Sequence, residues 1–231
     1  MNAIGPGFAW LAQAQQWHGA NGIPARLLQH LGYVGISLLI AALIALPAGL
    51  LIGHTGRGGF LVVSLANFGR ALPTLGLVVL AFAVALAYLG SAGTSAAYIV
   101  PLVALAIPPI LVNAYEGMLG VDPGLKDAAR GMGMTGPQLL RKVEAPVALP
   151  LILLGLRTAA IQVVATATIA AYVGLGGLGR YIIDGLATND YAEVAGGALL
   201  VVMLALAVQA AFVGLRWLIV PAGLRLQAQP A

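Results

Sequence analysis

The stretch at residues 122–146 reads DPGLKDAARGMGMTGPQLLRKVEAP and lies between long apolar segments. Its start has the pattern of a helix start, because Asp122 can cap free N–H groups and Pro123 falls at the first helical position, where its missing donor costs nothing. Four apolar residues then recur at i, i+3, i+4 and i+7 and form one narrow stripe, namely Leu125, Ala128, Ala129 and Met132. Gly131 and Gly133 are expected to end this helix after about two and a half turns.

A second helix start follows, because Thr135-Gly136-Pro137-Gln138 has the spacing of a capping box. The stretch therefore predicts two short helices at an angle, with small Ala and Gly residues on the first. A compact helix with such a surface can enter a groove on another protein. The alternative is a capped amphipathic loop helix that has no partner.

The same stretch resembles the EAA signature of ABC importer permeases. The matching pattern is Asp127-Ala128-Ala129, three residues, Gly133, nine residues and Val143-Glu144-Ala145-Pro146. Asp127 stands where this family usually has Glu, and Ala145 where it usually has Leu. The resemblance implies cytoplasmic coupling helices that dock into an ATPase subunit, and it assigns this role to Asp127, Ala128, Ala129, Arg130, Gly131, Met132, Gly133 and Pro146.

The composition places the rest of the chain in a membrane. Hydrophobic residues make up 61% of the 231 residues and charged residues only 8%. Soluble domains carry about 25% charged residues, so this chain could not cover itself with a hydrated surface. The net charge of +4 is scattered and does not indicate nucleic-acid binding, and the absence of cysteine excludes disulfides. We expect one integral-membrane domain in contact with lipid, without a cleavable signal peptide.

Five crossings are predicted from the long apolar segments, at residues 31–53, 59–90, 96–118, 147–173 and 194–215. The segment 59–90 is either one long helix broken near Pro73 or an interfacial piece followed by a span. Three prolines in 96–118 predict an irregular helix packed against neighbours. His54 is expected to be a loop residue with no ligand role. The corresponding organisation is an external or interfacial segment 1–29, with Trp rings at headgroup level, a transmembrane domain 30–216 and a cytoplasmic tail 217–231.

Two sets of polar residues are candidates for a translocation path. Asn67 and Arg70 interrupt an apolar segment, which transporters often place beside a pathway, although Arg70 could instead snorkel to a nearby surface. Thr158, Gln162 and Thr166 fall on one helical face at i, i+4 and i+8. They line the passage or only bond to neighbouring helices.

A glycine-rich segment at residues 174–179, GLGGLG, matches G-x-G-x-x-G. That pattern indicates a nucleotide site only between a strand and a helix, and this copy follows a membrane span. We expect a tight turn in which backbones approach closely. Asp184, Asp190 and Glu193 are expected to form a solvated acidic loop and no metal site.

Three further runs resemble the osmoprotectant (glycine betaine, choline and proline) subfamily of type I ABC importer permeases. They are LANFGRALPTLGL at 65–77, RTAAIQVVATATIAAYVG at 157–174 and TATIAAYVGLGGLG at 166–179. With the coupling stretch, the resemblance covers roughly residues 30–215. It implies an all-α integral membrane fold of about five transmembrane helices with cytoplasmic coupling helices.

The distribution of basic residues predicts the orientation. With the coupling stretch in the cytoplasm, Arg26 and Arg180 fall outside, and the inside holds Arg57, Lys126, Arg130, Arg141, Lys142, Arg216 and Arg225. Five crossings then put the N-terminus outside. A sixth crossing within residues 59–72 would move it inside.

The resemblance implies a permease subunit of an ATP-driven importer for a small osmolyte in the bacterial cytoplasmic membrane. The chain has no G-x-x-x-x-G-K-[ST] loop, so a separate ATPase dimer would bind ATP and Mg²⁺, and the chain itself would need no cofactor and perform no bond chemistry. A second permease copy, identical or paralogous, and an extracytoplasmic substrate-binding protein are the other expected partners. The alternatives are another solute, such as an amino acid, methionine or ergothioneine, and a different class of protein, either an ion-driven secondary transporter or a membrane scaffold.

Overall fold

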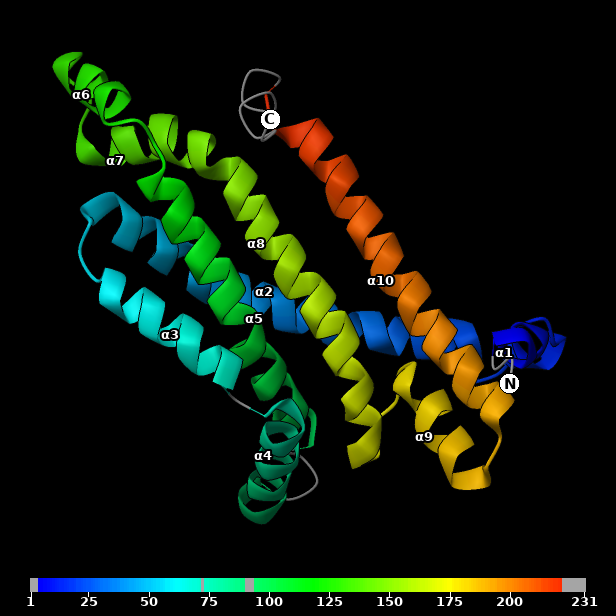
Figure 1. Cartoon of the computed structure of the whole chain (residues 1–231). Helices are drawn as coiled ribbons and strands as arrows, with labels where there is room; N and C mark the ends of the chain where they lie inside the picture. Colours follow the sequence, from blue (N-terminus) through cyan, green and yellow to red (C-terminus); the bar gives the residue numbers. More distant parts are fainter. Residues whose placement is uncertain (1–3, 72, 90–93, 222–231) are drawn as a thin grey trace. The chain divides into compact units, whose positions relative to one another are not determined.

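The computed structural model describes residues 4–71, 73–89 and 94–221, which form helices joined by short turns (Figure 1). The expected all-α fold is confirmed. In chain order the elements are α1 (Ile4–Leu11), a 3-10 turn (Ala14–Trp17), α2 (Ile23–Thr55), α3 (Gly59–Ala71), α4 (Thr74–Leu89), α5 (Thr94–Leu119), α6 (Pro123–Gly131), α7 (Gly136–Leu139), a π-helical turn (Leu140–Glu144), α8 (Ala145–Thr166), a 3-10 turn (Ala167–Val173), α9 (Gly179–Thr188) and α10 (Tyr191–Ile219). Residues 222–231 of the expected tail, with Arg225, lie outside the described residues.

Four helices in the described part of the chain are long and apolar enough to cross a membrane, namely Ile23–Thr55, Tyr98–Leu119, Gly136–Ile169 and Tyr191–Ile219. A span needs about 20 residues. The segment 59–90, which was expected to supply one further crossing, forms α3 with 13 residues and α4 with 16. Its break lies near Pro73, as expected. The further crossing stays a prediction, because neither helix has the full spanning length.

The helix α2 is longer at both ends than the predicted segment 31–53. It begins at Ile23, with Pro24 in the first turn, where proline is tolerated. It ends after Thr55, because the next residue, Gly56, has a left-handed φ of +67°. The expectation that His54 is a loop residue is therefore wrong.

The chain divides into two compact units, each described by itself below. Unit 1 contains Met1–Leu38, Leu72–Leu105 and Ala160–Val208, and unit 2 contains Leu39–Ala71, Ala106–Ala159 and Gln209–Ala231.

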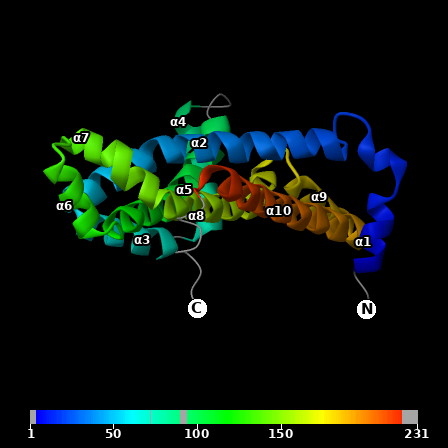
Figure 2. The same ribbon diagram turned by 90° about the horizontal axis from the view of Figure 1, so that it is seen from above.

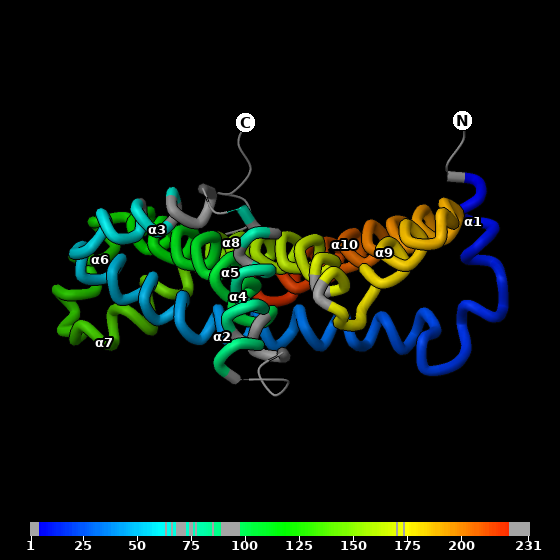
Figure 3. The backbone as a smooth tube through the Cα atoms, turned by 90° about the horizontal axis from the view of Figure 1, so that it is seen from below, coloured from blue at the N-terminus to red at the C-terminus, as the bar shows by residue number. Residues whose placement is uncertain are grey.

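In unit 1, α1 packs against α9 and the first turns of α10 (Figure 3). The Trp10 ring meets Tyr181 edge to face, with ring centroids 5.0 Å apart, and both join Ile23 and Leu178 in a buried cluster. The expectation that the Trp rings lie at headgroup level stays a prediction. Burial raises the pKa of Tyr181 to about 12, so its hydroxyl stays protonated and donates to the Asn21 carbonyl at 2.8 Å.

The glycine-rich segment at residues 174–179 also belongs to unit 1, and it follows a 3-10 turn rather than a strand. Gly177 has a φ of +93°, and its N–H donates to Gln29 Oε1 at 3.0 Å. A Cβ on Gly179 would lie 2.1 Å from the carbonyl oxygen of Thr168. The expected close approach of backbones is confirmed.

The acidic residues near the last span were expected to form a loop, and this expectation is wrong. Asp184 lies in α9, and its Oδ2 accepts from Arg180 Nε at 3.1 Å. Asp190 precedes α10, and its Oδ1 accepts from the N–H groups of Ala192 and Glu193 at 3.0 and 3.1 Å. The three carboxylates are therefore helix residues or a helix cap, a pattern that the loop interpretation missed.

In unit 2, small residues let the end of α2 pack closely on α5. A Cβ on Gly53 would lie 2.4 Å from Met118 Cβ, and one on Gly49 would lie 2.8 Å from Ala114 Cβ. Such spacing of small residues is typical of helix contacts in membranes. The buried cluster of Ala114, Met118, Ala148 and Ile152 joins α5 to α8. This packing fixes the helix ends from which the polar stretch 122–146 extends (Figure 2).

Candidate coupling site

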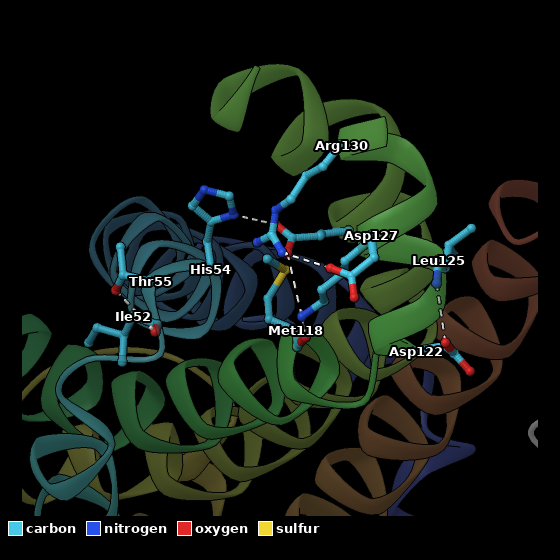
Figure 4. Close-up of polar contacts among 10 residues, drawn as sticks. Ile52, His54, Thr55, Met118, Asp122, Leu125, Asp127 and Arg130 are labelled. Carbon is cyan, nitrogen blue, oxygen red and sulfur yellow. Dashed lines mark hydrogen bonds and ion pairs between the residues drawn. The ribbon is translucent and has the colours of Figure 1, made fainter. Parts of the chain in front are cut away.

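The helix α6 begins as its sequence predicts. Oδ1 of Asp122 accepts from the N–H groups of Gly124 and Leu125 at 2.6 and 3.2 Å, and Pro123 occupies the first turn. Figure 4 shows the second of these bonds. The cap satisfies two of the N–H groups that have no partner within the helix.

The end of α6 is fixed by Gly133. Its N–H donates to the Arg130 carbonyl at 2.9 Å, and the Met134 N–H donates to the Ala129 carbonyl at 3.2 Å. This pair of bonds is a Schellman motif, which requires a left-handed residue just after the helix. Gly133 has a φ of +82°, a conformation that glycine adopts without steric cost. The predicted stop is confirmed.

The second short helix of the prediction is instead the beginning of a long one. Gln138 Oε1 accepts from the Thr135 N–H at 2.9 Å, so this half of the capping box forms. The chain then stays helical through α7, the π-helical turn and α8. π-helical turns inside α-helices are frequent at functional sites.

A buried carboxylate lies in that π-helical turn. Glu144 is only 1% exposed, and its Oε2 accepts from His54 Nδ1 at the end of α2. Its Oε1 lies 3.5 Å from Nζ of Lys126 on α6, and the same Nζ donates to the Met118 carbonyl of α5 at 3.1 Å. We call these three side chains, Glu144, His54 and Lys126, the Glu144 clasp. It links four elements within unit 2.

The buried carboxylate of the Glu144 clasp needs both of its partner side chains to be stable. A carboxylate removed from water is costly unless it is paired and hydrogen-bonded. Removal of one partner from a buried ion pair typically costs about 3–5 kcal/mol, because the remaining charge is left uncompensated. Since an ionised carboxylate can only accept, the His54 ring must carry its proton on Nδ1. Figure 4 shows His54 at the end of α2, directed toward the coupling stretch.

Sequence reasoning missed the Glu144 clasp. Glu144 was noted only as part of a signature, and His54 was assigned to a loop. The two residues are 90 positions apart, so no periodicity could pair them. The available signal was a carboxylate placed directly before a long apolar segment, where an unpaired charge would be costly.

The face of α6 away from the clasp is exposed and largely apolar. Of the predicted apolar stripe, only Ala129 is buried. Leu125, Ala128 and Met132 are exposed, and Met132 is 73% exposed, so most of its side chain is left uncovered by the chain. We call these three residues the α6 apolar surface. An apolar stripe that finds no core inside its own chain favours a partner that covers it.

The remaining predicted coupling residues lie on α6, in the turn that ends it or in α8. Asp127 and Arg130 are exposed and paired, with Oδ1 and Nη1 3.1 Å apart, as Figure 4 shows. Such an exposed pair stabilises the helix only slightly. Gly131, Gly133 and Pro146 are also exposed. The predicted residues from Asp127 to Gly133 thus lie together on α6 and the turn that ends it, with Ala129 buried, whereas Pro146 lies in α8.

Among the described residues, no hydrogen bond or ion pair joins the candidate path residues to one another. Thr158 is exposed in unit 2, and its hydroxyl donates to the Leu154 carbonyl of its own helix at 2.9 Å. Gln162 is exposed and Thr166 half-buried in unit 1. Asn67 is exposed on α3, whereas the side chain of Arg70 lies outside the described residues. A path lined by these residues stays a prediction.

Comparison with known proteins identifies the family to which this architecture corresponds. Residues 45–222 match the family model described as binding-protein-dependent transport system inner membrane component. The chain is 35% identical over 178 residues to the glycine betaine/carnitine/choline transport system permease protein OpuCB of Bacillus subtilis (strain 168), a match that covers 77% of this chain and 79% of the relative. It is 36% identical over 180 residues to the osmoprotectant import permease protein OsmY of Salmonella typhimurium, covering 77% of this chain and 74% of that protein.

A solved structure has the same fold. The MetNI methionine ABC transporter in an inward-facing conformation contains a chain that matches with a TM-score of 0.74 at 25% identity. The match covers 86% of this chain and 96% of that chain. The expected class, a permease of the type I importer fold, is confirmed.

Proposed function

The chain belongs to the family of binding-protein-dependent transport system inner membrane components, and we propose that it is the multi-pass permease subunit of an ATP-driven importer for a small osmolyte. The solutes are expected to be of the glycine betaine, choline and proline type. Relatives named for glycine betaine, carnitine and choline transport support this substrate class. The observation that carries the coupling part of the proposal is the exposed α6 apolar surface, in a polar stretch between two spans.

The partner proposed for α6 is an ATPase subunit with a groove. The helix has only nine residues, is capped at both ends and carries Ala and Gly beside its apolar side chains, so it can enter a narrow groove without bulky obstruction. Burial of Met132 and Leu125 in such a groove would remove apolar surface from water, which favours association.

In the proposed mechanism the ATPase binds the nucleotide and the permease provides the pathway for the solute. The ATPase dimer binds ATP and Mg²⁺, since this chain has no phosphate loop, and closure of that dimer displaces α6. The spans respond by alternating access between the two sides of a bacterial plasma membrane. A second permease copy completes the pathway, and an extracytoplasmic binding protein selects and delivers the solute. The permease itself performs no bond chemistry.

The experiment that tests this proposal is purification of the chain in detergent together with the products of its neighbouring genes, followed by an ATPase assay. We expect an ATPase and a binding protein to be recovered, and hydrolysis to rise when binding protein loaded with glycine betaine or choline is added. If the chain purifies without an ATPase, or hydrolysis ignores the binding protein, the proposal is wrong.

A second candidate solute class is amino acids, which the similarity to the methionine transporter favours. The same purified binding protein distinguishes the two classes. Tight binding of methionine, with no binding of choline, glycine betaine or proline, would assign the chain to amino-acid import and leave the permease role unchanged.

Gln162→Leu tests the proposed path. If the exposed amide of Gln162 on α8 contacts the solute, its loss should reduce the uptake rate by roughly tenfold, the factor that corresponds to about 1.4 kcal/mol. Recovery of the ATPase in co-purification should not change. Gln15→Leu, the same substitution in the exposed turn at residues 14–17, is the control. Equal uptake by both variants would mean that Gln162 only bonds to neighbouring helices and does not line the path.

A further inference from the structure

The helix α6 is anchored to its own unit by few apolar contacts. Of its nine residues only Ala129 is buried, and the other apolar side chains of its stripe are exposed. The polar contact between Lys126 and Glu144 is therefore a principal attachment of this helix to the rest of unit 2.

The Glu144 carboxylate divides its two oxygens between different helices. Oε2 accepts from His54 at the end of α2, and Oε1 faces the Lys126 ammonium of α6. Lys126 also donates to the Met118 carbonyl. That carbonyl lies in the last turn of α5, where carbonyl groups have no partner within the helix. The buried carboxylate thus joins α6 to the end of α2 and the beginning of α8, and Lys126 joins α6 to the end of α5.

Stability alone gives little reason for such an arrangement. Well-packed apolar residues of similar volume are often as stabilising as a buried ion pair, or more so. Ion pairs with fixed geometry instead favour one arrangement of the groups over its neighbours, because a small displacement leaves charges uncompensated. The clasp therefore makes sliding of α6 relative to α2, α5 and α8 costly.

We propose that Glu144 is a positioning residue of the transport cycle, which makes α6 move as one body with the end of α2 and the beginning of α8, while Lys126 ties α6 to the end of α5. The inference rests on the proposed function, in which an ATPase displaces α6. With the Glu144 clasp intact, that displacement is transmitted to three long helices at once. Without it, α6 keeps only the Lys126–Met118 bond and the burial of Ala129, and its displacement is transmitted less completely to α2 and α8.

The test is Glu144→Gln in the complete complex, with uptake and ATP hydrolysis measured on the same proteoliposomes. The ATPase should still co-purify and hydrolyse ATP, because the α6 apolar surface is unchanged. Uptake per ATP hydrolysed should fall by about tenfold or more, within the range of known coupling effects. The matched control is Glu116→Gln, which removes an exposed carboxylate from α5 and should leave the ratio unchanged.

Two Lys126 variants separate positioning from simple destabilisation. Lys126→Met should reduce the same ratio, and the double variant Lys126→Met with Glu144→Gln should be no worse than either single variant, as expected for one shared interaction. Lys126→Arg keeps the cation and should restore most of the ratio. If co-purification, hydrolysis and uptake all fall together in Glu144→Gln and Lys126→Met, Glu144 is merely structural and the inference is overturned. An unchanged ratio would also overturn it.

Amide hydrogen exchange measured on the permease alone tests whether the clasp holds α6, and the test does not depend on the proposed function. In Glu144→Gln the amides of α6 should exchange about tenfold faster than in Glu116→Gln, because the helix has lost one of its few attachments to the rest of unit 2. Equal exchange in the two variants would show that the clasp does not hold α6. If the wild-type chain recruits no ATPase, the proposed function fails, and the exchange result still decides whether the clasp exists.

Discussion

Gly133→Glu should abolish solute uptake while the protein still inserts into the membrane and folds. Gly133 is exposed at the end of α6, and a Cβ there would meet nothing within 4 Å, so a new side chain would project outward beside the α6 apolar surface. A carboxylate in this place has to be desolvated when the groove of the ATPase closes over α6. We expect uptake to fall by about 100-fold, which corresponds to roughly 2.7 kcal/mol of lost docking.

The substitution also strains the backbone, and a matched control isolates that effect. Gly133 has a φ of +82°, where other residues pay roughly 1–2 kcal/mol. Gly56 has a φ of +67°, is equally exposed and has open space around it, but it follows α2 rather than α6. Gly56→Glu should therefore lower stability similarly and leave uptake within about threefold of wild type. Equal loss of uptake in both variants would attribute the effect to strain and contradict docking through α6.

Gly179→Val should remove most of the folded protein. A Cβ at this position would lie 2.1 Å from the Thr168 carbonyl oxygen and 2.8 Å from its carbonyl carbon. Because the obstacle is backbone, it cannot rotate away, and the cost should exceed the range of about 1–3 kcal/mol that is typical of overpacking. We expect the yield of monodisperse protein in detergent to fall at least about tenfold.

The control for this prediction is Gly35→Val on α2, in the same unit. A Cβ on Gly35 meets nothing within 4 Å, and the residue is exposed. Its yield and thermal unfolding midpoint should stay close to those of wild type. Comparable yields of the two valine variants would mean that the close approach of Gly179 and Thr168 does not hold in the membrane.

Local chemistry made α6 predictable from the sequence. Its start depends on Asp122 and Pro123, and its end on Gly133, so every determinant lies within a few residues of the helix. The apolar composition likewise predicted membrane helices without any knowledge of contacts.

The extent of the next helix and the site around Glu144 could not be predicted in this way. Thr135-Gly136-Pro137 has the pattern of a helix start, but nothing nearby in the sequence shows that the helix continues through a π-helical turn into α8. His54 follows a long apolar run and precedes glycines, a pattern that favours a turn. Its contact with the buried Glu144 depends on the packing of α2 on α5, which the local sequence does not show. Contacts over such distances in sequence are decided by tertiary packing.

The central claim is that α6 is the element on which the ATPase docks, and a single introduced cysteine tests it most directly. The natural chain has no cysteine, so Met132→Cys offers one thiol at the exposed end of the α6 apolar surface, and Thr188→Cys offers one exposed thiol on α9 as the control. Each variant is labelled with a maleimide photo-crosslinker on the purified permease alone, and it is illuminated after the ATPase has been added and the complex has formed. We predict a covalent adduct with the ATPase from position 132 and none from position 188. No adduct from position 132, or equal adducts from both positions, would contradict the account.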